Sequence, residues 1–114
     1  MKELVENWFS KWESGDFLQL PISDDFEHQS PFGIIKGKQD YLDLVKANES
    51  KFLGYRFIIH DAIYEKDKAC VRYTAIQNDF TLDVSEWYRC QDGLIKQVVA
   101  YYHIGDIRSE RELK

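Results

Sequence analysis

Two side chains, His28 and Glu86, have the chemistry of an acid and a base and could act as a pair. Glu86 alternates with Val84, Tyr88 and Cys90 along one predicted strand, so these side chains share one face of it. Burying a carboxylate in such an apolar row is costly unless it is paired, hydrogen-bonded or neutralised. We therefore expect Glu86 either at a wet edge of the sheet or in the wall of a cavity that tunes its pKa.

Two roles stay open for Glu86. In an apolar cavity a raised pKa would keep the carboxyl protonated, and it would donate a hydrogen bond to a ligand. A salt bridge to Arg72 or Arg56 on a neighbouring strand would instead lower the pKa and make Glu86 structural. The choice depends on the strand register, which the sequence does not give.

His28 is the candidate partner because Phe26, His28 and Ser30 alternate along another short strand that enters the predicted pocket. A free imidazole titrates near neutral pH, so His28 would serve as a general acid or base opposite Glu86. The alternative is a histidine that is hydrogen-bonded at the rim and binds nothing.

Aromatic residues are unusually frequent, with seven Tyr, seven Phe and three Trp in 114 residues. Because a small core does not easily hide so many rings, we expect some to line a pocket for a small, largely apolar, flat or ring-shaped molecule. The same spacing is also typical of a plain core. The candidate ligand-contacting residues are Trp8, Trp12, Ser30, Tyr41, Phe57, Tyr73 and Tyr88.

The charges argue against several partners. The net charge is −5, and the 15 Lys and Arg residues are scattered, whereas nucleic acids and anionic membranes need a clustered positive surface. His60, His103, Cys70 and Cys90 lack the spacing of metal ligands. We therefore expect no metal, no other cofactor and no covalent nucleophile, and we expect both cysteines to be buried free thiols.

No secretory or membrane-spanning segment is predicted, because Lys2, Glu3 and Glu6 interrupt the apolar residues at the start of the chain. The expected location is the cytoplasm. The length predicts one domain, residues 1–108, followed by a polar tail, residues 109–114.

The first half of the chain reads as mostly helical. Apolar residues at helical spacing predict an amphipathic helix over residues 2–14, closed by Gly15, and a short helical turn follows over 16–20. A brief strand over 26–29 and a turn over 30–33 lead to Gly37, which precedes a second long helix ending near Gly54.

The second half predicts four strands, over residues 55–64, 69–76, 80–90 and 94–103, joined by three hairpins into an antiparallel meander. Several of these strands carry apolar residues on both faces, so the second face of the sheet should also be covered. A homodimer through the sheet is the simplest cover.

This order of elements resembles the nuclear transport factor 2-like superfamily, and most closely its branch of SnoaL-like cyclases and ketosteroid isomerases. The resemblance spans nearly the whole chain and rests on three segments: the helix ending at Gly15-Asp16, the stretch Phe26-Glu27-His28-Gln29-Ser30-Pro31-Phe32-Gly33 with Gly37, and Glu86-Trp87-Tyr88-Arg89-Cys90-Gln91-Asp92-Gly93. It implies an α+β fold, a cone-shaped curved antiparallel sheet wrapped around N-terminal helices.

The resemblance also implies cofactor-free acid/base chemistry of the isomerase, cyclase or hydrolase type. In the ketosteroid isomerase branch, the base before a proline falls on Ser30, a tyrosine on Trp8 and a strand acid on Glu86, and only the acid is kept in kind. His103 stands where SnoaL-like cyclases commonly have an acid. Because one fold hosts many functions, a non-catalytic ligand-binding or protein-interaction domain stays open as the alternative.

Overall fold

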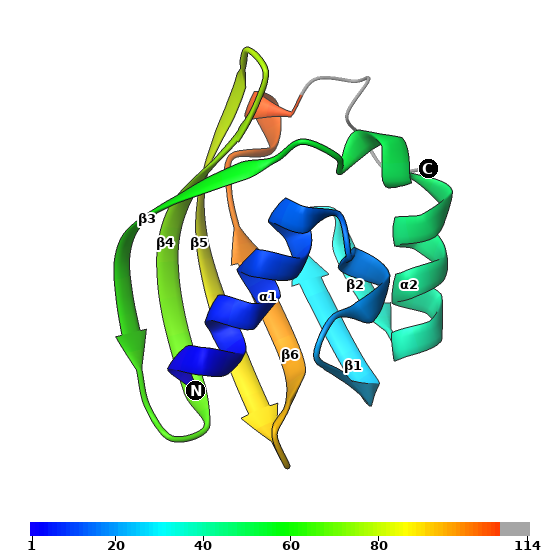
Figure 1. The fold of residues 1–114 in the computed structure, drawn as a ribbon, viewed down its shortest axis with the longest axis vertical. Coiled ribbons are helices and arrows are strands. Elements are labelled where there is room, and N and C mark those ends of the chain that lie inside the picture. The colour runs from blue at the N-terminus through cyan, green and yellow to red at the C-terminus, as the bar shows by residue number, and fades with distance from the viewer. Residues whose placement is uncertain (108–114) are drawn as a thin grey trace.

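A six-stranded sheet, in the order β2-β1-β6-β5-β4-β3, curls around helix α1 in the computed structural model, which describes residues 1–107 (Figure 1). Helix α2 lies at the β1–β2 side of the sheet (Figure 1). The helices are α1 (Lys2–Ser14), η1 (Phe17–Gln19), α2 (Lys38–Ala47), η2 (Glu49–Lys51) and η3 (Ile104–Asp106). The strands are β1 (Ile22–Ser30), β2 (Gly33–Lys36), β3 (Arg56–Tyr64), β4 (Lys68–Gln77), β5 (Phe80–Gln91) and β6 (Leu94–Tyr101). The predicted α+β cone is confirmed.

Helix α1 forms where the sequence predicts it and turns one face into the sheet. Val5, Trp8 and Phe9 are buried, which matches the helical spacing of their apolar side chains. Gly15 ends the helix with φ 82°, a left-handed conformation that glycine adopts without steric cost. The helix therefore presents its aromatic side chains to the concave face.

The meander of β3 to β6 also forms as predicted, with each strand antiparallel to the next. The last turn places Asp92 at φ 55° and Gly93 at φ 78°, the pair of positive φ angles of a tight hairpin turn that matches strand twist. In the register of β4 and β5, Glu86 lies opposite Val71, and Val84 lies opposite Tyr73. This register puts Glu86 on the concave face.

The connection between the helices differs from the prediction. Strand β1 begins at Ile22 rather than at residue 26, and it is followed by β2, an edge strand that the sequence did not indicate. β1 pairs antiparallel with β2 and parallel with β6. β2 has only four residues, which are too few to show the alternation of a strand, and the sequence therefore does not predict it.

Helix α2 is shorter than expected and ends at Ala47 rather than near Gly54. The Asn48 side chain donates a hydrogen bond to the Leu44 carbonyl over 2.8 Å, and the chain continues into the short helix η2. An amide that bonds the last helical turn competes with continuation of the helix. The chain after Ala47 therefore leaves the helix and leads through η2 to β3 (Figure 1).

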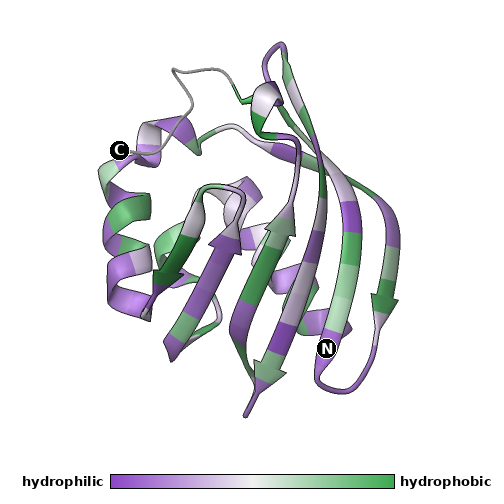
Figure 2. Ribbon diagram, turned by 180° about the vertical axis from the view of Figure 1, so that it is seen from behind, coloured by the Kyte–Doolittle hydropathy of each residue, from purple (hydrophilic) through white to green (hydrophobic). Residues whose placement is uncertain are grey.

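The convex face of the sheet carries large apolar side chains that the single chain leaves exposed. Ile63, Trp87 and Tyr101 are exposed by 68%, 48% and 57%, and hydrophilic and hydrophobic bands follow one another along the strands (Figure 2). The prediction that Cys70 and Cys90 are buried is wrong, because both free thiols are only partly buried. In Cys70 this follows from strand parity, since its neighbours Ala69 and Val71 take the concave side.

Within the described residues, no helix is long and apolar enough to cross a membrane. The predicted domain, residues 1–108, extends one position beyond the described part. The predicted polar tail, residues 109–114, lies outside the described residues.

Candidate functional site

A cavity of about 530 Å³ lies between the concave face of the sheet and the two helices. Most of the residues predicted to act on a ligand line it, and they come from α1, β1, α2, β3, β4 and β5. These are Trp8, Trp12, His28, Ser30, Tyr41, Phe57, Tyr73 and Glu86.

Tyr88 is the exception among the predicted ligand-contacting residues. Its ring is completely buried, and Trp8 packs against it edge-on at 6.2 Å between ring centroids. Tyr88 lies on the same strand face as Glu86, as its parity predicts, but its ring lies beneath α1 and therefore belongs to the core. Its hydroxyl reaches the site indirectly, through Glu86.

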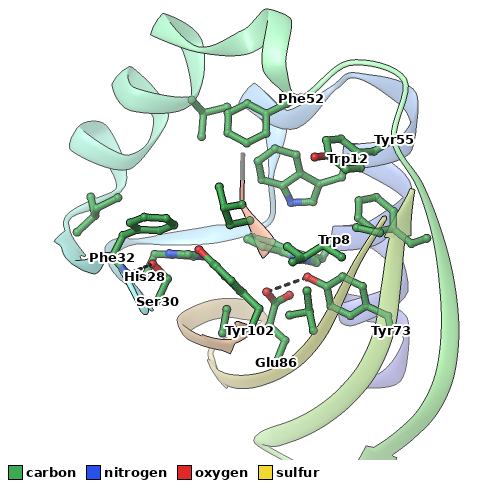
Figure 3. Close-up of a pocket in the computed structure, with 18 of the residues that line it drawn as sticks. Trp8, Trp12, His28, Ser30, Phe32, Phe52, Tyr55, Tyr73, Glu86 and Tyr102 are labelled. Atoms are coloured by element: carbon green, nitrogen blue, oxygen red, sulfur yellow. Dashed lines mark hydrogen bonds between the residues drawn. The ribbon is translucent and has the colours of Figure 1, made fainter. Parts of the chain in front are cut away.

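Glu86 is held in the wall of the cavity by side chains from three elements. It is only 5% exposed. Tyr73 donates a hydrogen bond to Glu86 Oε2 over 3.1 Å (Figure 3), and Tyr88 donates one to Oε1. The Trp8 indole adds a third hydrogen bond. Both carboxyl oxygens are therefore solvated by the protein instead of by water.

Burial raises the pKa of Glu86 to about 7, while the hydrogen bonds from Tyr88, Tyr73 and Trp8 oppose the rise. The alternative salt bridge is absent. Arg72 instead pairs with Asp61, with Nη2 2.7 Å from Oδ2, outside the cavity. Arg56 lies opposite Ile76, farther along β4. Glu86 is thus a buried carboxyl that titrates near neutral pH.

His28 lines the same cavity from β1 and stacks on Tyr41 at 5.1 Å between ring centroids. Burial lowers the pKa of His28 to about 4. The expectation that His28 titrates near neutral pH is therefore wrong, because the cavity wall excludes the water that would solvate an imidazolium. Its neutral ring still offers one N–H and one lone pair.

Ser30 and Tyr102 form a second polar group near His28. The Phe32 backbone N–H donates to Ser30 Oγ over 3.2 Å, and a hydrogen bond from Ser30 lowers the pKa of Tyr102, although burial raises that pKa more. Tyr102 extends from the end of β6 toward His28 and Ser30 (Figure 3). Sequence reasoning missed Tyr102, and its parity with Val98 and Ala100 was the signal that could have found it.

Two further aromatic residues of the wall, Phe52 and Tyr55, lie between η2 and β3. Phe52 packs against Trp12 at 5.2 Å between ring centroids, and Tyr55 stacks on Phe57 at 5.9 Å. Both lie at the upper part of the cavity in Figure 3. Periodicity cannot place Phe52 in such a connection, whereas Tyr55 shares the parity of Phe57 in the strand predicted over residues 55–64, which was the signal that could have found it.

The described lining of the cavity contains no Lys or Arg side chain. In residues 1–107, no three His, Cys, Asp or Glu side chains gather in an arrangement that could hold a metal ion. The arrangement suits a molecule that is largely apolar, and it offers proton transfer at Glu86 and hydrogen bonds from Tyr102, Ser30 and neutral His28.

Solved structures share this fold at low sequence identity. A candidate ketosteroid isomerase from Kribbella flavida is 17% identical, with a TM-score of 0.72 over 89% of this chain and 76% of that one. AclR, a candidate hydroxylase from Streptomyces galilaeus, is 18% identical, with a TM-score of 0.72 over 90% and 88%. An LEH-like epoxide hydrolase from M. tuberculosis is 18% identical, with a TM-score of 0.74 over 91% and 83%.

These likenesses establish the fold and leave the reaction open. No curated protein matches the chain. A family model described as the SnoaL-like domain matches residues 5–98, which include most of α1, His28 and Ser30 on β1, and the whole of β5. The chain therefore belongs to the SnoaL-like domain family, within the nuclear transport factor 2-like fold.

Proposed function

We propose that this chain is an enzyme that binds a small, largely apolar molecule in its cavity and moves a proton with Glu86, without a cofactor. The observation that carries the proposal is the position of Glu86, a buried carboxyl with a pKa of about 7 in an aromatic cavity of about 530 Å³. A group that titrates near the working pH is effective both in accepting a proton and in returning it.

The residues around Glu86 give each step a physical basis. Hydrogen bonds from Tyr73 and Tyr88 stabilise the carboxylate before it accepts a proton. Each carboxylate oxygen can accept two hydrogen bonds, so Glu86 retains lone pairs for the bound molecule. Glu86 takes a proton from a carbon or a water molecule and gives it back at another position, while neutral His28 and Tyr102 orient the polar atom of the ligand.

The structural neighbours support an acid/base reaction in general terms. Proteins named as an isomerase and as an epoxide hydrolase share the fold. Shifting a double bond and opening an epoxide with water both require proton transfer, which a carboxylate in a water-poor cavity performs well. The two reaction types define the probes for a first test.

The test uses 2-tetralone, whose α-protons exchange with D₂O, and styrene oxide, whose hydrolysis consumes water. We expect the unmutated chain to accelerate at least one of these reactions and Glu86→Gln to lose that acceleration. Glu65 is an exposed carboxylate in the turn between β3 and β4, outside the cavity lining. Glu65→Gln is the matched control and should keep the acceleration. Binding of the probes is measured separately by the shift of tryptophan fluorescence.

A non-catalytic ligand-binding domain is the second candidate, favoured by the fact that both oxygens of Glu86 already have protein donors. Binding of both probes without any acceleration over Glu86→Gln would support this reading and contradict the catalytic one. If the domain instead serves to bind another protein, neither probe should bind in the cavity.

We also propose that a second copy of the chain covers the convex face of the sheet as a twofold dimer. Ile63, Trp87 and Tyr101 carry the proposal, since each is about half-exposed or more and all lie on that face. A twofold axis lets one apolar surface cover its own copy.

A further inference from the structure

The cavity holds one side chain that carries a negative charge near neutral pH and, among the described lining residues, no positive partner for it. Glu86 is the carboxyl. No Lys or Arg lines the cavity within residues 1–107, and His28 is neutral because burial lowers its pKa to about 4. Ionising a buried carboxyl without a cation beside it is costly, and the raised pKa of Glu86 expresses this cost.

The hydrogen bonds around Glu86 are arranged for the ionised form. The indole N–H of Trp8 can only donate, and it lowers the pKa of Glu86, as do the hydroxyls of Tyr73 and Tyr88. Donors directed at both carboxyl oxygens leave Glu86 to act as an acceptor toward anything else in the cavity. A ligand group seated there should therefore be a hydrogen-bond donor or a cation.

Aromatic rings stand beside this carboxylate and suit a cation as well. Trp12, Tyr41 and Phe57 line the cavity in addition to Trp8 and Tyr73, which turn their N–H and O–H edges toward Glu86. Phe9 packs edge-on against Tyr73 at 4.9 Å between ring centroids, and this contact holds the Tyr73 ring in place. The negative faces of such rings attract ammonium groups, most strongly where water is excluded.

We propose that the ligand of this cavity is an organic cation, an amine or quaternary ammonium group seated against Glu86, with an apolar body in the aromatic remainder of the cavity. The proposal rests on the proposed function only in placing the ligand in this cavity, and it adds the charge of the ligand. The ammonium group supplies a positive charge that no described lining residue gives to Glu86, and aromatic side chains of the cavity wall replace part of its hydration.

The test compares two probes of the same shape, phenyltrimethylammonium and tert-butylbenzene, which differ in one atom and one charge. The protein carries Trp87→Phe, because Trp87 is 48% exposed on the convex face, away from the cavity. The two remaining indole N–H resonances, those of Trp8 and Trp12, both report from the cavity lining. Their ¹H–¹⁵N shifts are followed as each probe is added.

We expect phenyltrimethylammonium to bind at least tenfold more tightly than tert-butylbenzene. Glu86→Gln in the same background should abolish this preference while tert-butylbenzene still binds. If Glu86→Gln does not fold, the two affinities measured in the protein that keeps Glu86 still test the proposal. Equal or tighter binding of tert-butylbenzene would overturn the cation proposal and leave an apolar pocket in place. Indole resonances that respond to neither probe would overturn the pocket as well.

A second readout is the pH dependence of phenyltrimethylammonium binding, since this probe cannot titrate. The titratable groups that interact electrostatically with Glu86 are four tyrosines, and burial raises the pKa of each: Tyr41, Tyr73, Tyr88 and Tyr102. They stay neutral between pH 5.5 and 8, as does His28. The affinity should therefore rise with pH through about 7, as Glu86 ionises, and an affinity independent of pH over this range would contradict the pairing with Glu86.

Discussion

Tyr73 on β4 donates a hydrogen bond to Glu86 on β5 over 3.1 Å, although the two residues are not opposite each other in the ladder. Tyr73 lies opposite Val84, and Glu86 lies opposite Val71. They are diagonal neighbours on the concave face, a spacing that a long aromatic side chain can bridge. The register of these two strands thus determines the protonation chemistry of the site.

Tyr73→Phe should raise the pKa of Glu86 above its present value of about 7, because the carboxylate loses one of the hydrogen bonds that favour ionisation. The titration of the Glu86 Cδ resonance by ¹³C NMR measures the shift. Tyr101→Phe removes an exposed hydroxyl from the convex face and should leave the titration unchanged. A Glu86 pKa that stays the same or falls in Tyr73→Phe would show that the tyrosine does not stabilise the carboxylate.

Glu86→Gln should stabilise the protein more at pH 8 than at pH 4. The pKa of Glu86 is raised from 4.5 to about 7 in the folded state, so the free energy of unfolding falls as pH rises through this interval and is constant above it. Glutamine removes this dependence, and the difference between the two pH values should reach about 3 kcal/mol. Urea denaturation of both proteins at each pH measures it. A variant that is relatively less stable at pH 8 would indicate a salt bridge instead.

His28 should make the protein less stable in acid. Its pKa is lowered from 6.5 to about 4 on folding. Between these two pH values the imidazole binds a proton in the unfolded chain but not in the folded chain, so the free energy of unfolding falls as pH drops from 6.5 to 4. His28→Phe keeps a ring against Tyr41 and cannot titrate, so it should lose less stability between pH 7 and pH 5. Parallel losses in both proteins over this range would contradict the burial of a neutral imidazole.

Trp8→Ala should reduce the free energy of unfolding by about 3 kcal/mol or more, because the ring is only 3% exposed and its loss leaves a cavity beneath α1. Trp87→Ala, on a ring that is 48% exposed, should cost roughly 1 kcal/mol. Chemical denaturation of both variants compares the same substitution inside and outside the cone. An unfolding midpoint in Trp8→Ala equal to that of the parent would contradict the packing of α1.

Sedimentation equilibrium should show a dimer at micromolar concentration. Trp87→Glu should shift the equilibrium toward the single chain, because it places a charge in the middle of the apolar convex face. Lys38→Glu changes the charge of α2, which packs on the concave side of the sheet, and serves as the control. A species of single-chain mass for the unmutated protein at this concentration would contradict the dimer.

The sequence by itself determined the parts of the protein that depend on local spacing. Helix α1 and its end at Gly15 follow from a helical period and a left-handed glycine, and the Asp92-Gly93 hairpin follows from turn chemistry. Strand alternation placed Glu86 on the same face as Val84 and Tyr88, and only the structure showed that this face is the buried one. These features are decided within a few residues, where backbone geometry leaves little choice.

The tertiary structure decided everything that depends on which segments meet. The parallel pairing of β1 with β6 places His28 opposite Val98, so that β1 runs alongside β6 toward Tyr102, just beyond its end. Tyr88 shares a strand face with Glu86. Helix α1 covers Tyr88, so Tyr88 belongs to the core, whereas Glu86 lies in the cavity wall. The low pKa of His28 and the high pKa of Glu86 likewise arise from burial, which depends on the surrounding elements and not on neighbours in the chain.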